Sequence, residues 1–202
     1  MLVIKPITNR QANEAVASWH RHNAPLPDLH IDFCYGLFEY VRHTEAGIGA
    51  EELLGVAIVG NPCGRPTGTD RKLILEVRRV CFKPDTVFHK LRRYYTEKVH
   101  KDEMSLRTMP ILVQNIDGTQ PFAQGNAIPA YKIPSYFLAV AEFYTKQKYT
   151  NIKRLWTYIQ DTEDGRYIEE AGYTRDKFVK SRGNGHTAKH RYALELEGFR
   201  CR

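Results

Sequence analysis

The chain has 202 residues, of which 42% are hydrophobic, and its formal net charge is +7. This length allows one substantial core, and the chain contains no run of about 18 apolar residues that would span a membrane. The N-terminal apolar run is too short for a signal peptide, so we expect a soluble, cytoplasmic protein. The positive charge favours an anionic partner, either nucleic acid or a phosphorylated cofactor. The four cysteines lack CxxC or zinc-ribbon spacing, so we expect reduced thiols and no metal site.

The first 82 residues have the pattern of a strand, a helix and three more strands. Residues 2–7 are strand-like, and Thr8 with Gln11 forms a capping box that predicts the start of a helix. Three further strand-like runs follow, at residues 30–41, 52–62 and 73–82. Turn-forming segments separate these three runs, so we predict an antiparallel meander.

Residues 83–130 have a different pattern, which we interpret as a basic, loop-rich insertion. Asp85 is a candidate cap for a helix with a narrow apolar stripe and a basic surface. The residues of this surface that we expect to bind nucleic-acid phosphates are Lys90, Arg92, Arg93 and Lys98. The segment that follows is interrupted by prolines and is expected to be loop.

The remaining residues predict a helix, a strand, a short helix and a closing strand. Pro134 suits the first position of a helix, and Gly172 suits the end of the short helix. The strands are expected at 152–159 and 190–196. This order lacks the repeated βα alternation of a doubly wound fold. We therefore predict an α/β (α+β) mixed sheet with helices on both faces.

Strand 73–82 carries three charges, Glu76, Arg78 and Arg79, where a central strand normally carries almost none. Because an unpaired buried charge is costly, these charges must pair with one another, meet a ligand or border a cleft. Strict alternation along the strand places Val77, Arg79 and Cys81 on one face, and Glu76 on the opposite face with Val80.

Several stretches resemble the GNAT N-acyltransferases, and in particular a phage and prophage group related to the Mom DNA-modification proteins. They are SWHRHN, ELLGVAIVGNPCGR, LEVRRVC, IPSYFLAVAEFY and TYIQDTEDGRYIEEAGY. The resemblance covers most of the chain except roughly residues 83–130. It implies one GNAT-like domain over residues 1–202, with the insertion inside it. Mom-type proteins place a carbamoylmethyl-type group on the exocyclic amine of adenine in DNA, which blocks restriction enzymes. A phage- or prophage-encoded protein of this kind would act in the bacterial cytoplasm.

The resemblance also implies where an acyl donor binds. The donor would be acetyl-CoA or another activated acyl compound, either a small molecule or one bound to a carrier. In a GNAT sheet the fourth and fifth strands, here 73–82 and 152–159, are parallel neighbours that separate at one end, and the donor lies between them. The candidate donor-binding residues are Val77, Arg78, Val80, Ser135 and Tyr136. The usual Q/R-x-x-G-x-G/A loop that holds the pyrophosphate is missing from GNAIPAYKIP, which puts ordinary coenzyme A binding in doubt.

The candidate catalytic residues are Glu76, Arg79, Tyr158, Asp161 and His20. Glu76 would act as general base or orient the amine, and Arg79 would hold an anionic group or fix Glu76. Tyr158 would protonate the leaving group, Asp161 would accept the amine proton, and His20 would line the acceptor side. Each residue has a structural alternative: an Arg–Glu network, core packing for Tyr158, helix capping for Asp161, and the helix dipole for His20.

Three functions fit these features. The first is transfer of an acyl group to the exocyclic amine of a nucleic-acid base, adenine in phage DNA above all. The second is acetyl-CoA-dependent transfer to a small-molecule or protein amine. The third is a catalytically degenerate GNAT domain that binds nucleic acid. The missing pyrophosphate motif favours an unusual donor or the third function, whereas the charged strand favours chemistry.

Overall fold

The protein is described by a computed structural model. It covers residues 1–19, 25–42, 49–63, 72–86, 108–119, 126–180 and 187–196. The expected basic helix with Lys90, Arg92, Arg93 and Lys98 lies outside the described residues, as does His20. Those assignments therefore stay predictions. Within the described part of the chain, no helix has the length and apolar character that crossing a membrane requires.

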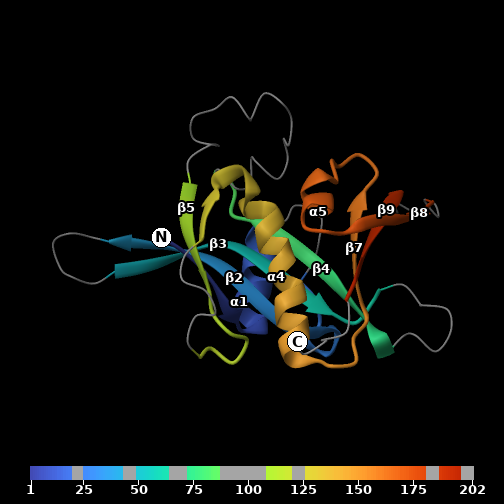
Figure 1. Ribbon diagram of the computed structural model, residues 1–202, viewed down its shortest axis with the longest axis horizontal. Helices are drawn as coiled ribbons and strands as arrows, with labels where there is room; N and C mark the ends of the chain where they lie inside the picture. The colour runs from blue at the N-terminus through green and yellow to red at the C-terminus, as the bar shows by residue number, and fades with distance from the viewer. Residues whose placement is uncertain are drawn as a thin grey trace.

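One mixed sheet of nine strands organises the described residues, in the order β6-β5-β1-β2-β3-β4-β7-β9-β8 (Figure 1). The strands are β1 (Leu2–Ile7), β2 (Ile31–Arg42), β3 (Gly49–Gly60), β4 (Ile74–Phe82), β5 (Thr108–Val113), β6 (Asn126–Pro129), β7 (Arg154–Gln160), β8 (Thr174–Val179) and β9 (Lys189–Glu195). Strands β2, β3 and β4 are antiparallel neighbours, which confirms the predicted meander. Two pairs, β1 with β5 and β4 with β7, are parallel.

Helices cover both faces of the sheet, as predicted. The helices are α1 (Asn9–Trp19), α4 (Ile133–Lys148) and α5 (Arg166–Glu170), with short 3-10 turns η1 (Asp28–His30) and η4 (Ala130–Lys132). In Figure 1, α4 crosses in front of the sheet and α1 lies behind it. The predicted capping box begins α1: the Thr8 amide donates to Gln11 Oε1 at 3.0 Å, and the Gln11 amide donates to Thr8 Oγ1 at 3.2 Å. Gly172 has a φ of 92°, so the predicted left-handed end of the short helix is confirmed.

The larger core lies between the sheet and α4. Phe137 is fully buried, and its ring centroid lies 4.9 Å from that of Tyr35 on β2 and 5.4 Å from that of Phe82 on β4. The hydroxyl of Tyr35 donates to the backbone carbonyl of Phe137 at 3.0 Å, so this buried polar group is satisfied. A smaller core under α1 contains Val16 and Cys81.

Three strands lie where the sequence pattern predicted none. Strands β5 and β6 extend the sheet beyond β1, and Pro110 precedes Ile111, the first β5 residue that pairs with β1. Pro129 ends the edge strand β6, so these prolines occupy positions that a sheet tolerates. Strand β8 is the other edge, and its side chains are mostly exposed, so it lacks the alternation that marks a half-buried strand.

Candidate active site where β4 and β7 separate

Strands β4 and β7 begin as parallel neighbours and then separate. Their register runs from Ile74 opposite Arg154 to Val77 opposite Thr157, although β4 continues to Phe82 and β7 to Gln160. At the last pair, Thr157 Oγ1 donates to the Val77 carbonyl at 3.1 Å. Figure 1 shows the two strands running apart on the side where α4 begins. The predicted parallel pair that separates at one end is confirmed.

A β-bulge in β4 lies immediately after this point. In the ladder with β3, Val59 is opposite Val77 and Ile58 is opposite Arg79, so Arg78 is an extra residue. The extra residue reverses the alternation of the strand. Val77 packs in the core under α4, while Cys81 packs under α1. The prediction that these two share a face is therefore wrong, and Arg79 lies on the same face as Glu76, the α1 face.

Glu76 is nearly buried, with 4% of its surface exposed. One carboxylate oxygen accepts a hydrogen bond of 2.7 Å from the backbone amide of Cys63, which follows β3. Burial raises the pKa of Glu76, and the Cys63 amide and the charges of Arg78 and Arg79 oppose this shift only in part. A buried carboxylate with a raised pKa is suited to accepting a proton near neutral pH.

Both arginines have guanidinium atoms without a partner among the described residues. Arg78 Nη2 lies 2.7 Å from Cys63 Sγ, and Arg79 Nη1 donates to the Arg78 carbonyl at 2.7 Å. The Nε atoms of both side chains are buried and form no hydrogen bond within the described structure. Burial is also the largest influence on Arg79, and it lowers the pKa of that guanidinium. These contacts differ from the structural Arg–Glu network considered above, because neither guanidinium hydrogen-bonds Glu76 among the described residues.

Tyr158 on β7 belongs to the same side of the sheet. Burial raises the pKa of its hydroxyl, the Glu76 charge adds to this shift, and a hydrogen bond with Arg191 opposes it. Arg191 is fixed by Asp176, which accepts from Nε at 2.9 Å and from Nη2 at 2.8 Å. The guanidinium carbon also lies 4.0 Å from the centre of the Trp156 ring. Arg191 therefore holds Tyr158 near Glu76, and neither Arg191 nor Asp176 was a sequence-predicted site residue.

Asp161 lies elsewhere. Its carboxylate contacts His190 Nε2, and Arg175 Nε lies 2.9 Å from the other ring nitrogen of His190. His190 and Tyr192 are two residues apart on β9, so their side chains lie on the same face of the sheet. Tyr192 is part of the core under α4, so this cluster is on the face opposite Glu76. His190 was not predictable from the sequence, because one histidine in a strand carries no spacing signal.

Ser135 and Tyr136 lie in the first turn of α4. The Ser135 hydroxyl donates to the Lys132 carbonyl at 2.9 Å and lies 3.4 Å from a carboxylate oxygen of Glu170 on α5. This turn also lies near the far end of β4, because Phe137 packs against Phe82. Tyr136 is half-buried, which raises the pKa of its hydroxyl. The two residues thus lie on the α4 side of the site.

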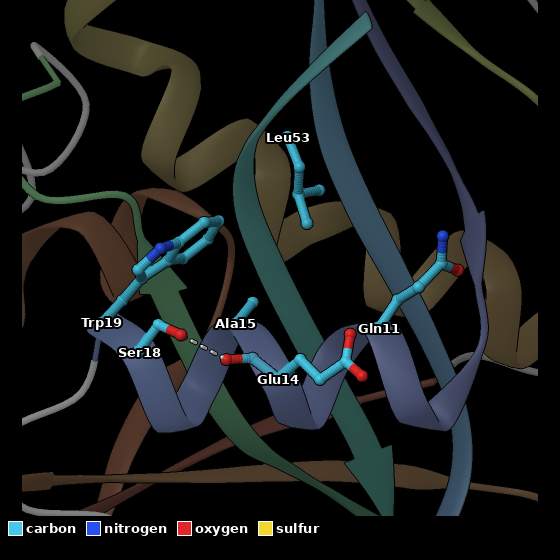
Figure 2. A pocket seen from close by; sticks show the side chains of 6 residues that line it. All are labelled: Gln11, Glu14, Ala15, Ser18, Trp19 and Leu53. Atoms are coloured by element: carbon cyan, nitrogen blue, oxygen red, sulfur yellow. Dashed lines mark hydrogen bonds between the residues drawn. The ribbon is translucent and has the colours of Figure 1, made fainter.

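A separate shallow groove, with a volume of about 260 Å³, follows the exposed flank of α1 (Figure 2). Its lining residues are Gln11, Glu14, Ala15, Ser18, Trp19 and Leu53. Figure 2 shows the Trp19 ring at one end of the groove and Leu53 of β3 above the helix. None of the residues described at the β4–β7 separation lines this groove.

No protein-family model and no curated protein matches the sequence. Solved structures do match. NAA60 from Arabidopsis thaliana, in complex with a bisubstrate analogue, is 8% identical with a TM-score of 0.55, over 98% of this chain and 99% of that one. The aminoglycoside acetyltransferase AAC(6')-Ib, in complex with coenzyme A and kanamycin, is 10% identical with a TM-score of 0.50, over 96% and 95%. A GNAT-family acetyltransferase from Streptococcus pneumoniae is 9% identical with a TM-score of 0.50, over 98% and 100%. With nearly complete coverage and the separating β4–β7 pair, this chain has the GNAT fold.

Proposed function

We propose that this protein is a GNAT-type N-acyltransferase, with its reactive centre where β4 and β7 separate. The observation that carries the proposal is the position of Glu76, a buried carboxylate with a raised pKa, beside the last β4–β7 pair. A degenerate domain would have no need to keep such a charge in a central strand, where burial makes it costly. The catalytic function is therefore favoured over a purely nucleic-acid-binding one.

The donor would be acetyl-CoA or another activated acyl compound, held between β4 and the start of α4. The solved structures of this fold include one with coenzyme A, which supports a donor of that class. In this chain, η4 precedes α4 in place of the missing glycine-containing loop, and Lys132 adds a positive charge there. The first amide groups of a helix favour a phosphate, and the Ser135 hydroxyl is already engaged with a backbone carbonyl. We therefore assign donor binding in α4 to backbone amides near Ser135 and Tyr136, and in β4 to the backbone of the stretch Val77, Arg78 and Val80.

The proposed reaction needs one proton acceptor and one proton donor. Glu76 accepts a proton from the acceptor amine, directly or through a water molecule, as the nitrogen attacks the carbonyl carbon of the donor. The carbon–sulfur bond of a thioester donor then breaks, and the Tyr158 hydroxyl donates its proton to the departing sulfur. Its raised pKa keeps Tyr158 protonated before this step. Asp161, on the opposite face with His190, is not assigned a part in proton transfer.

For the acceptor we propose the exocyclic amine of a DNA base, with adenine first, in an anti-restriction modification of phage DNA. The net charge of +7 and the resemblance to Mom-related proteins support this choice. The lone pair of this amine is delocalised into the ring, so the reaction requires a base such as Glu76. Extruding the nucleotide costs a few kcal/mol, which contacts with phosphates would offset. A small-molecule or protein amine is the second candidate, because a kanamycin complex is known for this fold.

The test is mass spectrometry of nucleosides from bacterial DNA with and without expression of the protein. A new, heavier deoxyadenosine that disappears with Glu76→Gln supports the proposal. If all nucleosides stay unmodified while acetyl-CoA raises the melting temperature of the purified protein, the acceptor is another amine. If neither a modified nucleoside nor stabilisation by a panel of acyl-CoA compounds is found, the acyltransferase assignment fails.

A further inference from the structure

Two positive charges lie next to each other on β4 with one carboxylate beside them. Arg78 is the bulge residue and Arg79 follows it, where β4 and β7 have already separated. Among the described residues, Glu76 is the carboxylate whose charge acts on Arg79, and it cannot balance both guanidinium groups. Within the described structure, a positive charge is therefore left over at the proposed reactive centre.

The described residues also leave part of the hydrogen-bonding capacity of these arginines unused. Arg78 Nη2 lies against the Cys63 sulfur, a weak acceptor, and both Nε groups are buried without a partner in the described structure. The indole nitrogen of Trp156, a residue directly opposite Glu76 in the ladder, is likewise buried and unpaired among the described residues. Buried donors in native proteins normally have partners, so these groups indicate a ligand that supplies acceptor oxygens.

The position of Arg79 indicates which reactant carries those oxygens. Arg79 and Glu76 lie on the α1 face of the sheet, whereas α4, whose first turn would hold the phosphates of the donor, lies on the other face. Glu76 is the proposed acceptor of the amine proton. An anion bound beside Glu76 would then be part of the molecule that carries the amine.

We propose that Arg78 and Arg79 form a binding site for an oxyanion, a phosphate or carboxylate, of the acceptor; the identification with the acceptor rests on the proposed function. A guanidinium fork suits either anion, because it offers two parallel N–H groups. The same charges repel polycationic acceptors, so aminoglycosides and polyamines are poor substrates. If the acceptor is DNA, the oxyanion is the phosphate next to the modified nucleotide.

The test measures stabilisation of the protein by inorganic phosphate and by acetate, at an ionic strength held constant with chloride. Each variant is compared with its own melting temperature without ligand, so a change in folding stability does not obscure binding. The variants are Arg79→Gln, Arg78→Gln and Arg79→Lys, and Arg10→Gln is the matched control because Arg10 is exposed on α1. We expect the Kd for the preferred anion to rise at least about tenfold in both glutamine variants, less in Arg79→Lys, and not in the control.

Preference for phosphate over acetate identifies a phosphorylated acceptor, and the reverse preference a carboxylate. The site is refuted if neither anion stabilises the wild-type protein more than chloride, or if every variant is stabilised equally, as binding at α4 would produce. Acetyl-CoA is titrated with the same preparations. If the wild-type protein binds phosphate but neither binds an acyl donor nor transfers an acyl group, the proposed function is refuted and the anion site is not. Acyl transfer without anion binding would refute only the anion site.

Discussion

Replacing Glu76 with Gln separates the chemical role of this residue from its structural role. Glutamine has nearly the same shape, and its side-chain oxygen can still accept the 2.7 Å hydrogen bond from the Cys63 amide. The variant cannot accept a proton from the amine. General-base catalysis contributes about 10² to 10⁴ in rate, so we expect activity to fall by about 100-fold or more, equivalent to about 3 kcal/mol or more of transition-state stabilisation.

In contrast to its activity, the stability of the Glu76→Gln protein should increase or hardly change. Burial raises the pKa of Glu76 in the folded state, so its contribution to stability is present below the unfolded pKa and is lost as pH rises through the folded pKa. Above the folded pKa the wild-type protein has lost that contribution, whereas Gln does not titrate. Glu76→Ala is the informative contrast, because it leaves the Cys63 amide without its partner at a cost of about 1–3 kcal/mol.

The assay combines thermal unfolding with the yield of acylated product from the same preparations. The pH profile of kcat/KM adds a second readout: activity of the wild-type enzyme should fall as pH decreases through the raised pKa of Glu76, because the base becomes protonated. Full activity in Glu76→Gln would refute its assignment as the base. A lower melting temperature in that variant, with unchanged activity per folded molecule, would indicate a structural role instead.

Three further predictions concern DNA binding and the fold. Replacing Lys90, Arg92 and Arg93 together with Ala should weaken DNA binding similarly for all sequences and flatten the salt dependence by up to about 2–3 units of slope; an unchanged slope would mean that these side chains do not contact phosphate. Thr8→Ala removes a side-chain cap of α1 and should lower the free energy of unfolding in urea by about 1 kcal/mol, with Ser restoring most of it. Phe137→Ala should cost about 3–5 kcal/mol by the same measurement, and a loss below about 1 kcal/mol would contradict the packing against Tyr35 and Phe82.

The fold was largely predictable because its local signals agree with its packing. The Thr8–Gln11 capping box begins α1, Pro134 lies in the first turn of α4, and Gly172 ends the short helix, as their chemistry predicts. The missed strands have weaker signals. Strand β8 is an edge strand with exposed, charged side chains, so its sequence resembles a loop. Its place in the sheet depends on pairing with β9, and no local pattern in residues 174–179 indicates this pairing.

The site was predictable in part, from the cost of charge in a central strand. That argument led to Glu76 and Arg79, and the structure places both on one face. It could not separate Tyr158 from Asp161, which are three residues apart but lie on opposite sides of the sheet after the strand ends. The role of Arg191 in holding Tyr158 was also hidden, because it depends on the register of β7 with β9.

The bulge at Arg78 explains why alternation failed at the position that matters most for function. If β4 paired regularly through Arg78, strict alternation would point Arg79 toward the apolar core under α4, where a guanidinium has no acceptor. With the bulge, Arg79 shares the face of Glu76, and Val80 packs against the core in its place. Arg78 lies just beyond the last pair between β4 and β7, so the bulge is located where the two strands separate. The bulge also places the charged side chains of β4 close together at that point. Deleting Arg78 restores regular pairing and leaves Arg79 on the face of Glu76, so the deletion should weaken anion binding, as Arg78→Gln does, and the same titration with phosphate and acetate measures this loss.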